Sequence, residues 1–215
     1  MIDPSRTRHS YDLVAERYAT EIDDELAGKP LDRALLDAFA DSLAGGAVAD
    51  VGCGPGHVAA HLSEIGANVL GFDLSPAMCA ITTRDANVPA AAANMTALPV
   101  RSASLAGLIS WYAVIHLDAE QRAAAYAEFA RVLRPGGYAL MGFHVSDPDI
   151  PAGGARRLTE WWDRPVELTF RFLDPDDESR ALAAAGLRPL ARLDREPYAE
   201  VEHASRRCYL LTAKR

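Results

Sequence analysis

The most informative residues are two acids, each at the end of a short apolar run, on either side of a glycine-rich turn. The first run, 48–57, carries Asp50 and then three glycines at alternate positions; the second, 68–73, ends in Asp73. An apolar run, alternate glycines and a helical pattern predict a strand, a tight turn and a helix start. A ligand can lie against bare backbone in such a turn, so the first half of the chain carries the chemistry of a ligand site.

The residues around the turn indicate the charge of that ligand. The dinucleotide fingerprint G-x-G-x-x-G would place its third glycine at position 57, which is His57. Asp50 would repel a diphosphate and attract an ammonium group, because two unit charges 3–4 Å apart interact by roughly 4 kcal/mol at an effective dielectric near 20. No Gly-Lys-Ser/Thr follows, which excludes a P-loop. The turn therefore favours a cationic, amino-acid-like group.

Asp73 adds a nucleoside to this ligand. The acid at the end of the second strand of a doubly wound sheet binds the ribose hydroxyls of a bound nucleoside. A nucleoside that carries an amino acid is S-adenosylmethionine. On these residues the chain resembles the class I S-adenosylmethionine-dependent methyltransferases, in particular the small bacterial enzymes of the methyltransferase type 11 kind.

The resemblance continues in order over roughly residues 10–145. Residues 93–100 look like the family's third motif, with Asn94 in place of its acid, and residues 131–141 match the family's passage from a helix into the fifth strand. Ala106 stands where the family often has Asp. The pattern from Tyr11 to Tyr18 resembles an N-terminal cap helix that closes over the cofactor. Five motifs in the right order are a strong signal, whereas a lone glycine turn is a weak one.

The resemblance implies a cofactor site built from these motifs. The amide oxygen of Asn94 would accept from the adenine amino group, and Leu74 and Met78 would wall the adenine, although a core role for Met78 is nearly as plausible. His57 would lie near the carboxylate of the cofactor. The cofactor-binding residues are expected to be Tyr18, Asp50, Gly52, Cys53, Gly54, Gly56, Asp73, Leu74, Met78, Asn94, Met95 and Trp111.

Two histidines are the candidate catalytic residues. Methyl transfer needs mainly an in-line alignment, and a base only when the acceptor arrives protonated with a high pKa. His116 follows the fourth strand and His144 ends the fifth, where reacting groups gather in a doubly wound sheet. The alternative, which we weigh equally, is that each is a polar residue hydrogen-bonded to backbone where a strand leaves the core.

The acceptor is expected to contact aromatic residues and one arginine. Aromatics near one pocket mouth favour a flat or apolar acceptor, and an inward-pointing arginine would favour a carboxylate. Core packing and a solvated arginine are the alternatives. The candidate acceptor-binding residues are Tyr11, Tyr112, Trp161, Trp162 and Arg171.

Composition limits the class of protein. The chain has 215 residues and a net charge of −8, which argues against a nucleic acid partner. The N-terminus is polar at once, and the longest uncharged apolar stretch, 102–117, is too short for a membrane span. Cys53, Cys79 and Cys208 are widely spaced, which is typical of a reducing cytoplasm. We expect a cytoplasmic monomer or homodimer without a membrane partner. We also expect no metal, because the acidic clusters come with no evident third ligand.

The hydrophobic pattern predicts an α/β fold. Strands are expected at 47–51, 68–72, 88–92, 105–111, 137–144, 166–172, 188–195 and 206–213; helices are expected at 10–25, 31–43, 56–65, 75–84, 118–133 and 175–185. This alternation indicates a Rossmann-like, doubly wound sheet of about seven strands, with an antiparallel C-terminal strand. We expect one domain: an N-terminal helical cap over 1–45, a cofactor-binding core over 46–145, an acceptor-side insertion over 146–172, and a C-terminal helix and strands over 173–215.

The resemblance implies transfer of a methyl group from S-adenosylmethionine to a small-molecule acceptor, with O-methylation ahead of N-methylation. The alternatives are methylation of a peptide or carboxylate end, and a sensor that binds S-adenosylmethionine without turnover. A nicotinamide oxidoreductase is a third possibility.

Overall fold

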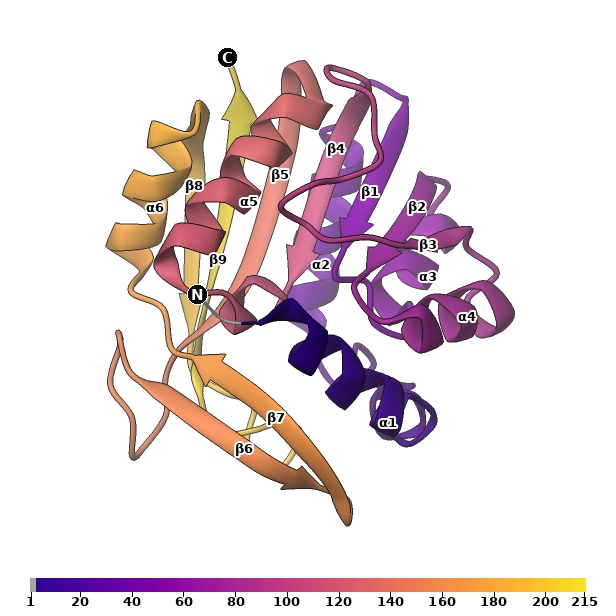
Figure 1. Ribbon diagram of the computed structural model, residues 1–215. Helices are drawn as coiled ribbons and strands as arrows, with labels where there is room; N and C mark the ends of the chain where they lie inside the picture. Colours follow the sequence, from indigo (N-terminus) through magenta and orange to yellow (C-terminus); the bar gives the residue numbers. More distant parts are fainter. Residues whose placement is uncertain (1–2) are drawn as a thin grey trace.

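A seven-stranded sheet forms the centre of the molecule, in a computed structural model that describes residues 3–215 (Figure 1). The strand order is β3-β2-β1-β4-β5-β9-β8. The strands are β1 (Ala47–Val51), β2 (Asn68–Asp73), β3 (Ala90–Ala92), β4 (Leu105–Trp111), β5 (Leu133–Ser146), β8 (Leu187–Arg195) and β9 (Arg206–Lys214).

The direction of the strands creates the site. The five strands from β1 to β5 are parallel, and β9 runs antiparallel to both β5 and β8. This confirms the predicted doubly wound sheet with an antiparallel C-terminal strand. In the register, Asp50 of β1 pairs with Gly71 of β2, so Asp50 and Asp73 reach the same edge of the sheet. Carboxyl ends of parallel strands gather reacting groups at such an edge.

Helices cover both faces of the sheet. They are α1 (Pro4–Ile22), α2 (Pro30–Asp41), α3 (His57–Glu64), α4 (Pro76–Asp85), α5 (Ala119–Val132) and α6 (Pro175–Ala184), with a 3₁₀ turn, η1 (Val114–His116). A capping box starts α5, since the Asp118 side chain accepts from the Gln121 amide and the Gln121 side chain accepts from the Asp118 amide. Among the described residues, no helix combines the length and hydropathy that a membrane crossing needs.

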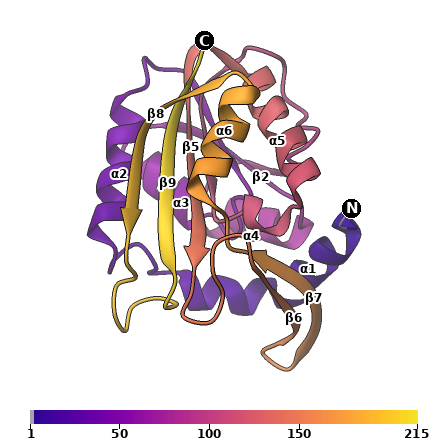
Figure 2. The same cartoon turned by 90° about the vertical axis from the view of Figure 1, so that its left-hand side faces the viewer.

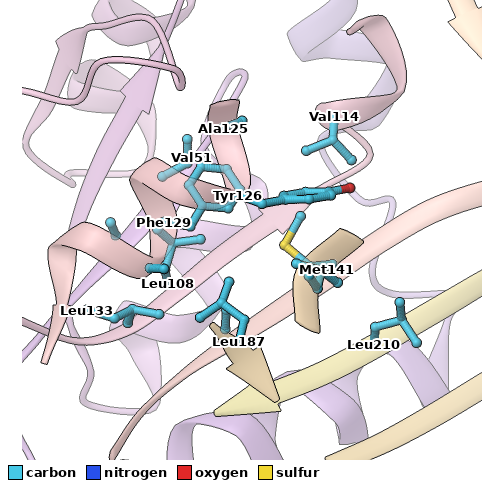
Figure 3. Packing of buried hydrophobic residues seen from close by; sticks show 14 of the residues in the cluster. Val51, Leu108, Val114, Ala125, Tyr126, Phe129, Leu133, Met141, Leu187 and Leu210 are labelled. Atoms are coloured by element: carbon cyan, nitrogen blue, oxygen red, sulfur yellow. The ribbon is translucent and has the colours of Figure 1, made fainter. Parts of the chain in front are cut away.

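Two apolar layers hold the helices against the sheet. In Figure 2, α2 lies on one side of the sheet and α5 and α6 on the other. Figure 3 shows Tyr126 and Phe129 of α5 packed among strand residues such as Leu108 and Met141, and all four are fully buried. Burying side chains of this size contributes roughly 1.5–3 kcal/mol each. The loops at the carboxyl edge are therefore mounted on a rigid core.

A small hairpin outside the main sheet lies below its carboxyl edge beside α1 (Figure 1). It consists of β6 (Ala155–Trp161) and β7 (Arg164–Arg171). The sequence predicts β7 at 166–172, because its apolar residues alternate, but not β6, whose residues are mostly polar and exposed. The helix predicted from residue 10 starts at Pro4, because Asp3 caps it and proline suits the first helical position.

Candidate functional site

A cavity of about 640 Å³ opens at the carboxyl edge of the sheet. Its wall combines α1, the glycine turn, the loops that follow β2, β3 and β4, the end of β5, the hairpin and the loop before β9. Fifteen of the predicted site residues line it: Tyr11, Tyr18, Gly52, Cys53, Gly54, Asp73, Leu74, Met78, Asn94, Met95, Trp111, Tyr112, His116, His144 and Trp161. Four predicted residues lie outside its wall: Asp50, Gly56, Trp162 and Arg171.

The glycine turn is braced from the second strand. The Gly54 amide donates to Asp73 Oδ2 at 2.9 Å, and the Ser75 amide donates to Oδ1 of the same carboxylate at 2.8 Å. Gly52 has φ +81°, and a Cβ there would lie 2.1 Å from the Ala113 Cβ. Only glycine fits this position. The turn, the acid and the start of α4 therefore form one preorganised unit.

Asp50 lies directly behind this turn and is 1% exposed. Within residues 3–215, neither of its carboxylate oxygens has a hydrogen-bond partner of good geometry. The backbone amide of Ala59 lies near the carboxylate and favours its charged form. Burial raises the pKa of Asp50 to about 7, and the nearby His57 only partly opposes this. A buried acid without partners favours a cationic group bound nearby, because that charge would hold the carboxylate ionised.

Asn94 lies in the wall, but its amide oxygen is engaged within its own loop. That oxygen accepts from the Thr96 amide at 3.0 Å and from the Thr96 hydroxyl at 2.9 Å. The carbonyl oxygen of an amide has two lone pairs, and both are used here. The predicted contact with an adenine amino group would have to replace one of these bonds.

His116, at the end of η1, is held between two other elements. Its Nδ1 lies 3.0 Å from the Thr169 carbonyl of β7, and its Nε2 lies 2.8 Å from the Tyr11 hydroxyl of α1. A carbonyl only accepts, so Nδ1 carries the proton and Nε2 accepts from the Tyr11 hydroxyl. Burial lowers the pKa of His116 to about 4. The residue is in the predicted place, but its lone pair is occupied and its basicity is low, which disfavours the predicted role as a base.

His144, near the end of β5, is also unsuited to accept a proton. Its Nδ1 lies 2.8 Å from the Ser205 hydroxyl, and its ring stacks on Tyr112 with centroids 4.7 Å apart. Burial, followed by the positive charge of Arg207, lowers its pKa to about 3. Tyr112 has φ +55°, a conformation that a bulky residue adopts only where its surroundings impose it. The local structure fixes both rings rather than preparing a base.

Aromatic rings form the wall on the side of α1 and the hairpin. Trp161 meets Tyr18 edge-on at 5.5 Å and Phe170 edge-on at 6.0 Å. Trp162 stacks on the outer face of Trp161 at 4.6 Å and does not line the cavity itself. It therefore supports the predicted acceptor-binding residue Trp161 instead of facing the acceptor. Edge-on and stacked rings of this kind suit a flat or apolar ligand.

The opposite wall carries charges that the sequence analysis missed. Lys29, 2% exposed, pairs with Glu25 and lies 3.0 Å from Glu202. Glu202 also lies 3.1 Å from Arg207, and Glu25 lies 3.1 Å from His57. Burial would raise the pKa of Glu202, but its bond to Arg195 and its neighbouring donors outweigh this and lower it to about 2. Residues so far apart in the chain follow no motif, so only the fold brings them together.

The arginine at the cavity is not the predicted one. Arg171 lies on β7 outside the wall, whereas Arg207 on β9 lines the cavity. Arg207 is 3% exposed and pairs across the strands with His144. Sequence reasoning assigned the acceptor side to the 146–172 insertion, but β9 also reaches this edge because it lies beside β5.

A family described as "Methyltransferase domain" matches residues 48–137 of the chain. The chain is 41% identical over 99 residues to a tRNA (carboxymethyluridine(34)-5-O)-methyltransferase of Macaca fascicularis, covering 45% of this chain and only 14% of that protein. It is 31% identical to a malonyl-[acyl-carrier protein] O-methyltransferase of Methylovorus sp., covering 86% of this chain and 64% of that protein. It is 27% identical to a ubiquinone biosynthesis O-methyltransferase of Methylocella silvestris, over 86% and 71%.

Solved structures share the fold. A Burkholderia thailandensis 1,6-didemethyltoxoflavin-N1-methyltransferase with bound 1,6-didemethyltoxoflavin and S-adenosylhomocysteine superposes with a TM-score of 0.76 and 19% identity, over 100% of this chain and 91% of that one. A Methanosarcina mazei S-adenosylmethionine-dependent methyltransferase gives 0.72 and 15%, over 82% and 96%. Likenesses at these identities concern the architecture.

Proposed function

The chain belongs to the class I S-adenosylmethionine-dependent methyltransferases, and on that premise we propose that it transfers the methyl group of S-adenosylmethionine to an oxygen atom of a small molecule. The observation that carries this proposal is one cavity at the carboxyl edge that combines two kinds of wall. One wall is the glycine turn, which Asp73 braces and behind which Asp50 lies buried without a hydrogen-bond partner. Another wall consists of aromatic rings.

The residues present fit the cofactor. S-adenosylmethionine supplies an activated methyl group on a positively charged sulfur. Gly52 and Gly54 leave the backbone open to it, and Asp50 provides a negative charge within the low-dielectric interior, where such a charge acts strongly. Asp73 is available to the ribose hydroxyls. The further cofactor contacts are assigned to Tyr18, Cys53, Gly56, Leu74, Met78, Asn94, Met95 and Trp111.

The chain contributes mainly positioning on the acceptor side. Tyr11, Tyr112 and Trp161 orient the acceptor in the cavity, and Trp162 supports Trp161 by stacking on it. His116 and His144 hold their neighbours in place through their Nδ1 atoms. Alignment of this kind can lower the barrier of a displacement by roughly 7–11 kcal/mol.

A small molecule as the acceptor agrees with the charge of the protein and with its relatives. The net charge of −8 disfavours a polyanionic nucleic acid, and two of the relatives that match most of the chain are named as O-methyltransferases. The cysteines of the described residues are free and buried, which agrees with a cytoplasmic location. We expect a monomer or a homodimer.

Calorimetry with S-adenosylhomocysteine and NADH tests the cofactor assignment. Asp73→Ala should weaken S-adenosylhomocysteine binding at least tenfold, because it removes both the ribose acceptor and the brace of the turn. Asp85→Ala, which changes an exposed acid paired with Arg84, is the matched control and should bind normally. Binding of NADH without S-adenosylhomocysteine would overturn the proposal. Normal affinity in Asp73→Ala would show that the ribose site lies elsewhere in the cavity.

A further inference from the structure

Arg207 lines the cavity, and its charged side chain is incompletely paired. Its Nη1 donates to the Ser205 carbonyl at 2.5 Å and to the His203 carbonyl at 3.2 Å, and its Nη2 donates to the same His203 carbonyl. In the part of the chain that the structure describes, its buried Nε has no acceptor. A buried, unpaired N–H of a charged group is costly, on the order of 1–3 kcal/mol or more. An anionic ligand group beside the guanidinium would offset part of this cost.

The charge of Arg207 is also only partly compensated. Its carboxylate partner is Glu202, which is shared with Lys29 and Arg195. Lys29 has Glu25 as a second partner, and Arg195 has Asp32. Among the described residues, Arg207 has no second carboxylate. It is therefore the cation of this wall that an anionic ligand group would complement best.

Arg207 lies where the acceptor is expected. Its backbone pairs with His144 at the end of β5, and its guanidinium carbon is 5.8 Å from the centre of the Tyr112 ring, which follows β4. Both neighbours line the cavity at the carboxyl edge. The aromatic residues Tyr11, Trp161 and Phe170 line the same cavity on the side of α1 and the hairpin. An acid with an aromatic body would match both walls.

The two histidines at this edge do not offer a base. The Nε2 lone pair of His116 already accepts from the Tyr11 hydroxyl, and burial and the charge of Arg207 lower the pKa of His144 to about 3. A phenol or an alcohol loses its proton with difficulty in such a wall, because the proton has no prepared acceptor. A carboxylic acid needs none, since it is already ionised at neutral pH.

We propose that the acceptor is an aryl-substituted carboxylic acid, bound with its carboxylate beside the guanidinium of Arg207, and that the product is its methyl ester. This inference rests on the proposed function and specifies its acceptor. One carboxylate oxygen forms the bond to the methyl carbon while the carbon–sulfur bond breaks, and the electron pair of that bond goes to sulfur. No proton is transferred. The ester is neutral, so its contact with Arg207 weakens and the product leaves.

Labelled S-adenosylmethionine and a panel of defined acceptors test this assignment. Phenylacetate and indole-3-acetate are compared with their amides and with matched phenols and anilines. The acids should accept the label and the amides should not, and mild alkali should release the label as volatile methanol, since esters hydrolyse and methyl ethers and amines do not. Label transferred only to phenols would overturn the inference and leave the proposed function intact, whereas label transferred only to anilines would contradict both. Transfer to none of the acceptors would count against both.

Variants of two adjacent arginines test the role of Arg207. Arg207→Gln should raise the KM for the acid at least tenfold, while the affinity for S-adenosylhomocysteine measured by calorimetry changes less than threefold. Arg206→Gln is the matched control, because Arg206 is exposed, pairs with Glu196 and lies outside the cavity wall. Arg207→Lys keeps the charge but lacks the guanidinium fork, and should recover part of the KM. Equal effects of Arg207→Gln on acid KM and cofactor affinity would overturn the inference. A KM for the acid in Arg207→Lys equal to that of the unmodified protein would also overturn it. This second variant keeps the inference testable if Arg207→Gln does not fold.

Discussion

The hydroxyl of Tyr11 donates to Nε2 of His116 at 2.8 Å, and the two rings meet edge-on with centroids 5.4 Å apart. Nδ1 of the same imidazole donates to the Thr169 carbonyl. One histidine thereby links α1, the turn η1 that follows β4, and strand β7 of the hairpin. These three segments come from distant parts of the chain and together cover the acceptor side of the cavity.

Tyr11→Phe should loosen this cover. The variant removes a hydrogen-bond donor and leaves the His116 Nε2 without its partner, which reduces the free energy of unfolding by about 1 kcal/mol. We expect a higher KM for the acceptor and faster amide hydrogen exchange in α1. Tyr138→Phe, on β5 away from the cavity wall, is the control. Unchanged exchange in α1 would show that the bond does not hold the cap.

The two buried histidines should destabilise the protein progressively as the pH drops below about 6.5. Burial lowers the pKa of His144 from its ordinary value to about 3, and that of His116 to about 4. The unfolded chain therefore binds more protons than the folded chain between these values and about 6.5, and the stabilising effect is complete above that range. Urea unfolding at pH 7.5 and pH 5.0 measures the loss. His144→Asn should reduce the difference between the two pH values by about 2 kcal/mol; an equal difference in both proteins would contradict the assignment.

Asp50→Asn should stabilise the unliganded protein at pH 8 and weaken cofactor binding. Burial raises the pKa of Asp50 to about 7, so the folded state holds an unfavourable charge above pH 7, and this penalty disappears as the pH falls toward the ordinary carboxyl pKa. The gain at pH 8 is on the order of 4 kcal/mol and should be smaller at pH 5. Denaturation of the free protein and calorimetry with S-adenosylhomocysteine measure the two effects. Unchanged affinity of the variant for S-adenosylhomocysteine would show that the charge of Asp50 does not contribute to cofactor binding.

Gly52→Ala and Gly66→Ala separate backbone strain from a steric clash. Both glycines have positive φ, +81° and +92°, so alanine costs about 1 kcal/mol of backbone strain at either position. A Cβ on Gly52 would lie 2.1 Å from the Ala113 Cβ, whereas no atom lies within 4 Å of one on Gly66. We expect Gly66→Ala to bind S-adenosylhomocysteine normally and Gly52→Ala to lose binding. Similar affinities in the two variants would contradict the requirement for glycine at position 52 of the turn.

Much of the framework is local in origin and could be predicted from the sequence. Alternate glycines after an apolar run specify the turn at Gly52, and the capping residues of α5 specify its start, because both effects act over a few neighbouring residues. Strand β6 was not predicted, because its polar residues follow no buried alternation and it forms only by pairing with β7. The sequence also predicts that His116 and His144 lie at the ends of strands. It does not predict which hydrogen bonds their rings form.

By itself, the sequence determined the order of the strands and helices, the glycine turn and the two acids beside it, since these depend on neighbouring residues and on the hydrophobic period. The tertiary structure decided what faces the acceptor. Arg207 and Lys29 enter the cavity wall from β9 and from the segment before α2, and the hydroxyl of Tyr11 occupies the imidazole of His116. These contacts join residues far apart in the chain, so they exist only once the sheet, the cap and the hairpin have packed together.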